Sequence, residues 1–292
     1  MSNIFIYPGK LVGSWVLLRQ LKQHHEQCEI WVAKHNGENF GEVVLKFDMI
    51  ENMTLELRMI LDYFQYHENY TITIPRIFRF GAQYMGDLFG TTKKYAWVAM
   101  KKCDNDLRAM YRSDKRFANE HYLTIMNQCI GDLIGLHFEG YTHGDVKAEN
   151  ILIKFDEDKP SVYLSDYGLA ENSKKVLEKG RPEHHHKYYM SYGGMYPDRP
   201  CGLRCDYEGL GIAVGLAMKH ICPSKYFTDD IETVKKNRRW ENLKDTIPEC
   251  LHRYFQVLSE ILPWSETKLP DQFERKIRES LKMENTEKEH VD

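Results

Sequence analysis

The sequence lacks any apolar run near the ~20 residues that are needed to span a bilayer. Its first eight residues also lack the basic stretch and the apolar stretch that together mark a secretory signal. These absences argue against a membrane protein and against a secreted one. We therefore expect a protein of the cytosol or the nucleus.

Cysteine is scarce, with seven residues scattered along the chain and no close CxxC pair. This pattern favours reduced thiols over a disulfide framework or a zinc site. Cys201 and Cys205 lie near each other, but no second pair accompanies them. The run His184–His186 also lacks partners at ligand spacing, which favours an exposed loop over a metal site.

Neither sign of charge dominates, because 40 Lys and Arg stand against 43 Asp and Glu. A net charge of −3 gives no global electrostatic reason to expect nucleic-acid binding. What the sequence does contain is 42% apolar and 28% charged residues over 292 positions. Such a chain can bury a substantial core as one bilobal unit or as two domains.

Two short stretches carry the polar groups of a phosphoryl-transfer site: Tyr141–Asn150 and Ser165–Gly168. That reaction depends mainly on positioning and on the neutralisation of charge. Asp145 can accept a hydroxyl proton, and Lys147 can steady a γ-phosphate. Asn150 and Asp166 can supply oxygen ligands to magnesium.

The chain between these two stretches predicts a β-hairpin. Short apolar runs at 151–153 and 162–164 flank a polar turn at 155–160. Because a hairpin returns the chain to the edge where it began, this one would bring Asn150 and Asp166 to the same edge.

The N-terminal region predicts a small antiparallel meander, with β-rich runs at 15–18, 30–33 and 43–47 and a turn at Asn36-Gly37. A lone lysine such as Lys46 is usually a solvated charge at a strand end. Here, however, the next segment has apolar residues at helical spacing: Met53, Leu57, Ile60, Leu61 and Phe64. Glu56 lies at the margin of that face, so it can pair with Lys46 and hold the ammonium against phosphates. Glu51 is the competing candidate.

Further along, a buried strand at 95–100 leads into a polar stretch that fits a domain hinge. Apolar spacing then predicts helices over 122–137 and 251–262. His137 is expected to be a satisfied core histidine. His143 is expected to pack beneath the catalytic loop rather than to act as the base.

Asp206 heads an apolar helix that continues through Leu216. Two interpretations stay open from the residues alone. A buried aspartate at this position can bind backbone amides of the catalytic loop, or its charge is simply favoured by the helix dipole.

Three motifs match those of a known family: His143-Gly144-Asp145 for His-Arg-Asp, Asp166-Tyr167-Gly168 for Asp-Phe-Gly, and Arg204–Gly211 for Arg-Arg-x-Asp-Leu-Glu-x-Leu-Gly. On these motifs the chain resembles the eukaryotic protein kinases over roughly residues 14–282. Within them it is similar to the vaccinia-related kinases of the casein kinase 1 group. The third motif favours the amide-binding role for Asp206.

This resemblance implies an α+β, bilobal protein-kinase fold, with a small β-rich N-lobe over 1–101, a mainly helical C-lobe over 102–283 and a polar tail over 284–292. It implies a Ser/Thr protein kinase that uses ATP and Mg²⁺ on protein substrates, chromatin-associated ones among them, and a viral origin is compatible with it. The catalytic residues would be Asp145, Lys147, Lys46 and Glu56, and the metal ligands Asn150 and Asp166. The ATP site would be formed by Lys46, Ile30, Val44, Met100, Lys101, Cys103 and Leu152.

Two departures from the family pattern concern turnover. Residues 22–28, where the Gly-rich loop should lie, contain no glycine, so backbone amides approach phosphates less freely. The segment at 186–191 lacks the family's threonine. A pseudokinase that acts as a regulatory binding module is therefore the alternative. A small-molecule kinase is disfavoured by Lys147 and by the stretch around Asp206.

Overall fold

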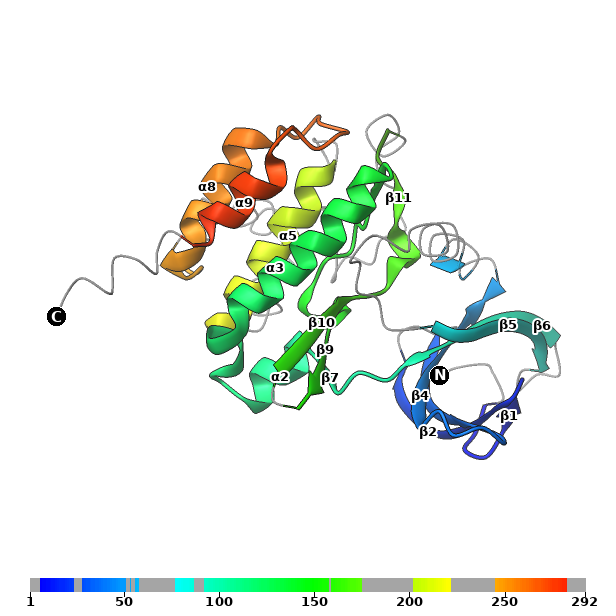
Figure 1. The fold of residues 1–292 in the computed structure, drawn as a ribbon. Helices are drawn as coiled ribbons and strands as arrows, with labels where there is room; N and C mark the ends of the chain where they lie inside the picture. The colour runs from blue at the N-terminus through cyan, green and yellow to red at the C-terminus, as the bar shows by residue number, and fades with distance from the viewer. Residues whose placement is uncertain are drawn as a thin grey trace, which may run out of the picture. The chain divides into compact units, whose positions relative to one another are not determined.

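The computed structural model describes residues 6–23, 28–50, 53, 56–57, 77–86, 92–157, 159–174, 202–221 and 245–282. These described residues fall into two compact units, one ending at Cys103 and the other beginning at Asp104. The first unit is built on strands and the second mainly on helices (Figure 1). No helix among the described residues is both long enough and apolar enough to cross a bilayer.

The first unit is a six-stranded antiparallel sheet with the strand order β1-β2-β3-β4-β6-β5. Its strands are β1 (Leu11–Val12), β2 (Trp15–Gln23), β3 (Glu29–His35), β4 (Glu42–Met49), β5 (Ile77–Gly86) and β6 (Thr92–Lys101). Strands β2, β3, β4 and β6 contain the runs that the sequence predicts as strands, and Asn36-Gly37 lies between β3 and β4. The predicted meander is therefore confirmed.

One face of this sheet buries an aromatic cluster that includes Trp15, Trp31, Phe47, Tyr95 and Trp97. Trp97 lies directly against two glycines. A Cβ built on Gly13 or on Gly81 would come within 2.7 or 2.6 Å of the Trp97 ring. Because protein interiors are close-packed, the indole fills the space that a side chain at either position would need.

The opposite face carries Lys46. In the strand register Lys46 lies across from Ile30 on β3 and from Val98 on β6, and Val44 lies across from Met100. Because side chains alternate along a strand, these five residues share one face. Val98 is fully buried, whereas Ile30, Val44 and Met100 are half-buried. This face is therefore an apolar surface that holds an ammonium group.

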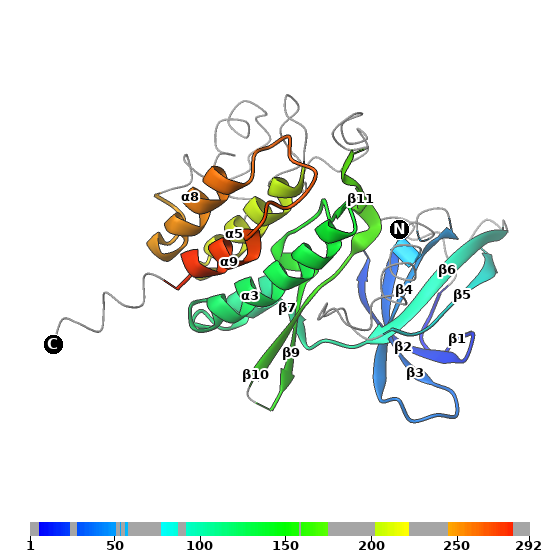
Figure 2. The ribbon, with the colours of Figure 1, turned by 45° about the horizontal axis from the view of Figure 1, so that its top comes forward.

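The second unit packs its helices around one apolar core. They are α2 (Leu107–Ser113), α3 (Phe117–Phe138), α5 (Leu203–Met218), α8 (His252–Ile261) and α9 (Phe273–Ser280). Helices α3 and α5 lie side by side in both views, and α9 lies next to α8 (Figures 1 and 2). Helix α3 contains the helix predicted over 122–137. Helix α8 covers most of the one predicted over 251–262, and a 3₁₀ turn (Glu249–Leu251) precedes it.

Strands β9 (Ile151–Asp156) and β10 (Lys159–Leu164) form the predicted hairpin. Its turn is shorter than predicted, because Phe155 and Pro160 pair within the ladder. Phe155 also packs edge-on against Phe117, with the ring centroids 5.8 Å apart, so the core extends the strand beyond its apolar run.

The hairpin places the two predicted metal-binding residues at its open end. Ser165 follows β10, and its N and Oγ donate hydrogen bonds to Asn150 O at 2.9 and 3.0 Å. Asp166 is the next residue along the chain. Asn150 and Asp166 therefore lie at the same edge, as the sequence predicts.

Candidate active site

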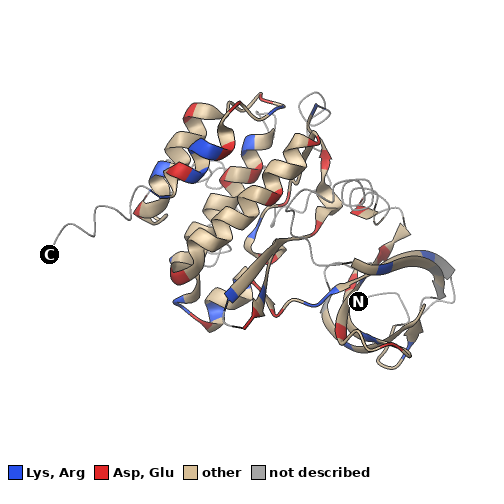
Figure 3. Cartoon of the chain, viewed as in Figure 1, with Lys and Arg blue, Asp and Glu red and all other residues tan. Residues whose placement is uncertain are grey.

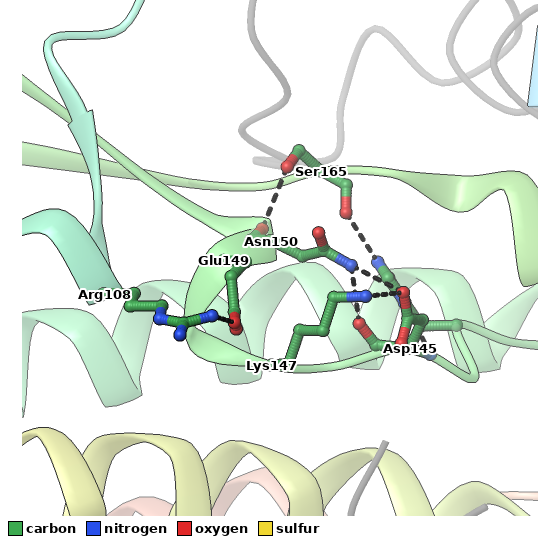
Figure 4. Close-up of polar contacts among 7 residues, drawn as sticks. Arg108, Asp145, Lys147, Glu149, Asn150 and Ser165 are labelled. Carbon is green, nitrogen blue, oxygen red and sulfur yellow. Dashed lines mark hydrogen bonds and ion pairs between the residues drawn. The ribbon is translucent and has the colours of Figure 1, made fainter. Parts of the chain in front are cut away.

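The loop between β8 (Tyr141–Thr142) and the 3₁₀ turn η1 (Ala148–Asn150) brings three polar side chains together. Lys147 Nζ lies 2.6 Å from Asp145 Oδ2, and Asn150 Nδ2 donates to the same oxygen at 2.9 Å (Figure 4). Asn150 Nδ2 also donates to Asp145 O at 2.8 Å. The other carboxylate oxygen, Asp145 Oδ1, is buried and accepts no hydrogen bond from the residues that the structure describes. One oxygen of Asp145 is thus held by two donors, and the other has no hydrogen-bond partner among the described residues.

Burial raises the pKa of Asp145 to about 6, because a carboxylate that is only 4% exposed is poorly solvated. The ammonium of Lys147 and the hydrogen bond from Asn150 oppose this rise in pKa, whereas the charge of Asp166 adds to it. Asp145 is therefore mostly ionised at neutral pH, yet its pKa is near enough for it to take up a proton. Such a group suits general-base chemistry.

Asp206, in the first turn of α5, fixes the backbone of this loop. Its side chain is fully buried, and it accepts hydrogen bonds from His143 N at 2.7 Å (Oδ2) and from Gly144 N at 2.8 Å (Oδ1). Oδ2 also lies 2.8 Å from His137 Nε2, and His137 Nδ1 lies 3.1 Å from Tyr207 OH. The amide-binding role of Asp206 is confirmed, and His137 is the satisfied core histidine that the sequence predicts.

His143 joins the two polar stretches. Asp145 N donates to His143 Nδ1 at 3.2 Å, which leaves the ring proton on Nε2, and Nε2 donates to Ser165 O at 3.1 Å. The ring also packs on Tyr167, with the centroids 4.8 Å apart. Because both ring nitrogens are engaged, His143 supports the loop rather than serving as the base, as predicted.

Asn150 and Asp166 offer oxygen atoms of the kind that magnesium prefers. The Asn150 amide nitrogen is turned toward Asp145, so its Oδ1 points away from that residue (Figure 4). Asp166 adopts φ 68° and ψ 69°, a left-handed conformation that non-glycine residues rarely hold, just before the 3₁₀ turn η2 (Tyr167–Leu169). One amide oxygen and one carboxylate fit magnesium, which is usually held by few protein oxygens together with phosphates.

In the first unit, Lys46 Nζ lies 2.7 Å from Glu56 Oε2. The two side chains are only 11% and 6% exposed, so water solvates neither charge well and the ion pair offsets part of that loss. The predicted ion pair is confirmed. The competing Glu51 lies outside the described residues, as do Ile60, Leu61 and Phe64 of the predicted helix.

The remaining predicted nucleotide-binding residues are spread over both units. Ile30, Val44 and Met100 share the face of Lys46, whereas Lys101 pairs with Val43 and so lies on the opposite face. Cys103 follows β6 and is half-buried. Leu152 is half-buried on β9 of the second unit.

An ion pair between Arg108 on α2 and Glu149 in η1 also belongs to this region, and no sequence motif indicates it. No periodic pattern connects residues that are 41 positions apart, so only the tertiary structure reveals this pair. Several predicted features lie outside the described residues: positions 24–27 of the glycine-free stretch at 22–28, the run His184–His186, the segment at 186–191, Cys201 and the tail at 284–292. None of the described cysteines forms a disulfide, as expected for reduced thiols: Cys28, Cys103, Cys129, Cys205 and Cys250.

The protein kinase domain model matches residues 44–253, a range that contains Lys46, the loop at 143–147 and Asp206. The chain belongs to the protein kinase family. Human serine/threonine-protein kinase VRK2 is similar to this kinase, with 23% identity over 169 residues, which are 56% of this chain and 32% of VRK2. The B1 kinase of vaccinia virus (strain Western Reserve) is 32% identical over 78 residues, which are 26% of each chain. The kinase thus matches less than half the length of these relatives.

A solved structure of vaccinia related kinase 3 superposes on this kinase with a TM-score of 0.69 at 18% identity, covering 97% of this chain and 92% of that one. This likeness confirms the protein-kinase fold class, an N-terminal antiparallel sheet followed by a helical part. Together with the relatives, it confirms the predicted resemblance to the vaccinia-related kinases.

Proposed function

We propose that this kinase is catalytically active and transfers the γ-phosphoryl group of MgATP to Ser or Thr hydroxyls of protein substrates. The observation that carries the proposal is the arrangement of Asp145. Lys147 and Asn150 hold its Oδ2, while its Oδ1 is buried without a hydrogen-bond partner among the described residues. A carboxylate arranged in this way keeps one oxygen ready for an incoming hydroxyl group.

In this proposal Asp145 Oδ1 accepts the hydrogen bond of the substrate hydroxyl and takes its proton. The hydroxyl oxygen forms a bond to the γ-phosphorus of ATP as the bond from that phosphorus to the β,γ-bridging oxygen breaks, which releases ADP. Lys147, 2.6 Å from Oδ2, balances the negative charge of the transferring phosphoryl group. Asn150 and Asp166 hold magnesium, which neutralises phosphate charge when it is bound. Lys46, kept in place by its ion pair, binds the α- and β-phosphates.

The test is phosphotransfer from labelled ATP, with magnesium, to generic protein substrates and to histones, because the family resemblance implies chromatin-associated targets. Asp145→Asn keeps the shape of the side chain but cannot act as a base, so it should slow transfer by roughly 10²–10⁴-fold. Asp271→Asn, at an exposed position of the same unit, is the matched control and should keep the wild-type rate. Equal rates from wild type and Asp145→Asn would refute the role of Asp145.

A pseudokinase is the second candidate, and the observation that favours it is the absence of glycine from residues 22–28. Each hydrogen bond lost between a backbone amide and a phosphate costs about 1.5–3 kcal/mol. If the kinase is active, glycines at Gln23 and His25 should therefore improve ATP affinity more than turnover. Cys28 is left unchanged, because its side chain is buried. The absence of both nucleotide binding and phosphoryl transfer, in the wild type and in this variant, would favour the pseudokinase.

A further inference from the structure

An ion pair links the turn η1, which directly follows Asp145 and Lys147, to a helix that carries none of the proposed catalytic residues. Arg108 Nη1 on α2 contacts Glu149 Oε1 in η1 at close range (Figure 4). The Glu149 side chain is 8% exposed and that of Arg108 is 22% exposed. Because a nearly buried carboxylate depends on its cation, this pair ties the turn η1 to α2.

Helix α2 is itself firmly placed. Asp106 caps its N-terminus, with Oδ1 accepting a hydrogen bond from Ala109 N at 2.7 Å. Asp106 also belongs to β7 (Asn105–Asp106), which pairs with Ile153 and Leu152 of β9. Arg108 therefore reaches Glu149 from a helix that is fixed, through β7, to the β9–β10 hairpin, and β9 directly follows η1.

The turn that Glu149 anchors also carries Asn150. Glu149 points toward α2, whereas the Asn150 side chain points toward Asp145 (Figure 4). Asn150 N donates to Lys147 O at 2.9 Å, which closes the turn, and Asn150 Nδ2 holds Asp145 Oδ2. A shift of η1 would therefore move the amide that orients Asp145.

We propose that Arg108 is a positioning residue of the phosphoryl-transfer site. By holding Glu149, its guanidinium fixes η1. The Asn150 amide nitrogen therefore stays against Asp145, and Asn150 Oδ1 stays in place for magnesium. The catalytic consequence rests on the proposed function. The structural consequence, a loop that loosens when the pair is broken, does not.

The experiment compares Arg108→Ala, Arg108→Lys and the control Arg116→Ala in the full chain. Arg116 forms an exposed pair with Glu120 in the same unit, with side chains 83% and 56% exposed, so its loss removes an arginine without touching η1. Since a misplacement of about 1 Å can cost about 10²-fold in rate, Arg108→Ala should lower kcat by roughly 10–100-fold. KM for ATP should change less than about threefold, because the lost interaction positions the loop and does not bind nucleotide.

Two further readouts separate positioning from loss of folded protein. The magnesium concentration for half-maximal rate should rise in Arg108→Ala, recover in part in Arg108→Lys and stay unchanged in Arg116→Ala. Hydrogen exchange should quicken in peptides covering residues 145–151 but not in those from the middle of α3. If Arg108→Ala does not fold, the isosteric Glu149→Gln takes its place with the same expectations.

If Arg108→Ala has the same kcat, magnesium dependence and loop hydrogen exchange as the wild type, the inference is overturned and the proposed function is left intact. If the wild-type protein transfers no phosphate, the proposed function fails. The exchange measurement then still decides whether Arg108 fixes the loop.

Discussion

Replacing Asp206 by Asn should destabilise the helical unit, because the carboxylate accepts hydrogen bonds on both oxygens. An amide has one oxygen, so in either orientation its NH₂ group faces the N–H of His143 or of Gly144. The buried N–H left without an acceptor costs about 1–3 kcal/mol. Each of the two bonds that remain, including that with His137, loses its charge assistance, at about 1 kcal/mol each. The expected loss in the free energy of unfolding is therefore about 3–5 kcal/mol.

Urea unfolding, followed by circular dichroism, measures this loss. The matched control is Asp156→Asn, since Asp156 is exposed and accepts a hydrogen bond from Ser161 Oγ at 3.2 Å. That change should cost less than about 0.5 kcal/mol. Amide exchange at His143 and Gly144 should also quicken in Asp206→Asn. An unfolding free energy within about 1 kcal/mol of wild type, with unchanged exchange, would show that the carboxylate does not anchor the loop.

Three further predictions concern nucleotide binding, proton transfer and magnesium binding. Lys46→Ala should abolish most ATP-induced thermal stabilisation, because it removes the ammonium that is paired with Glu56. Lys34 is exposed on the adjacent strand, so Lys34→Ala should keep that stabilisation. Equal stabilisation of the two variants by ATP would contradict the role of Lys46. The pH profile of kcat/KM should fall as pH is lowered through about 6, because protonated Asp145 cannot accept a proton; a constant kcat/KM down to about pH 5 would contradict this role of Asp145. Asp166→Ala should make the ATP-induced shift in melting temperature independent of magnesium, and a persistent magnesium effect would exclude Asp166 as a ligand.

Local patterns predicted much of the fold and part of the site. Strand alternation and helical spacing are properties of neighbouring residues, so the meander around Asn36-Gly37 and the helix α3 could be predicted without tertiary information. The partner of Lys46 could also be predicted locally, because apolar spacing places Glu56 at the margin of the buried helix face.

Features that depend on burial could not be predicted in this way. The hairpin turn is shorter than its polar sequence indicates, because Phe155 finds a partner in Phe117. The raised pKa of Asp145 arises from the solvent that the folded chain excludes, and no residue type encodes that. The pair of Arg108 and Glu149 depends on where α2 lies, so spacing along the chain carries no trace of it.

Trp97 restricts the substitutions that the protein can accept at Gly81 and Gly13 during evolution. While the indole is present, a side chain at Gly81 would overlap it, so Gly81→Ala as a first step passes through a destabilised protein. Trp97→Phe removes this overlap at the cost of a cavity in the aromatic cluster, and Ala at Gly81 then fills part of the space. Gly13 gains less from the same step, because its φ of +55° strains any residue with a Cβ. The residues at positions 81 and 97 are therefore coupled, since each single change costs stability and the pair of changes is compatible, whereas Gly13 stays constrained with either residue at position 97.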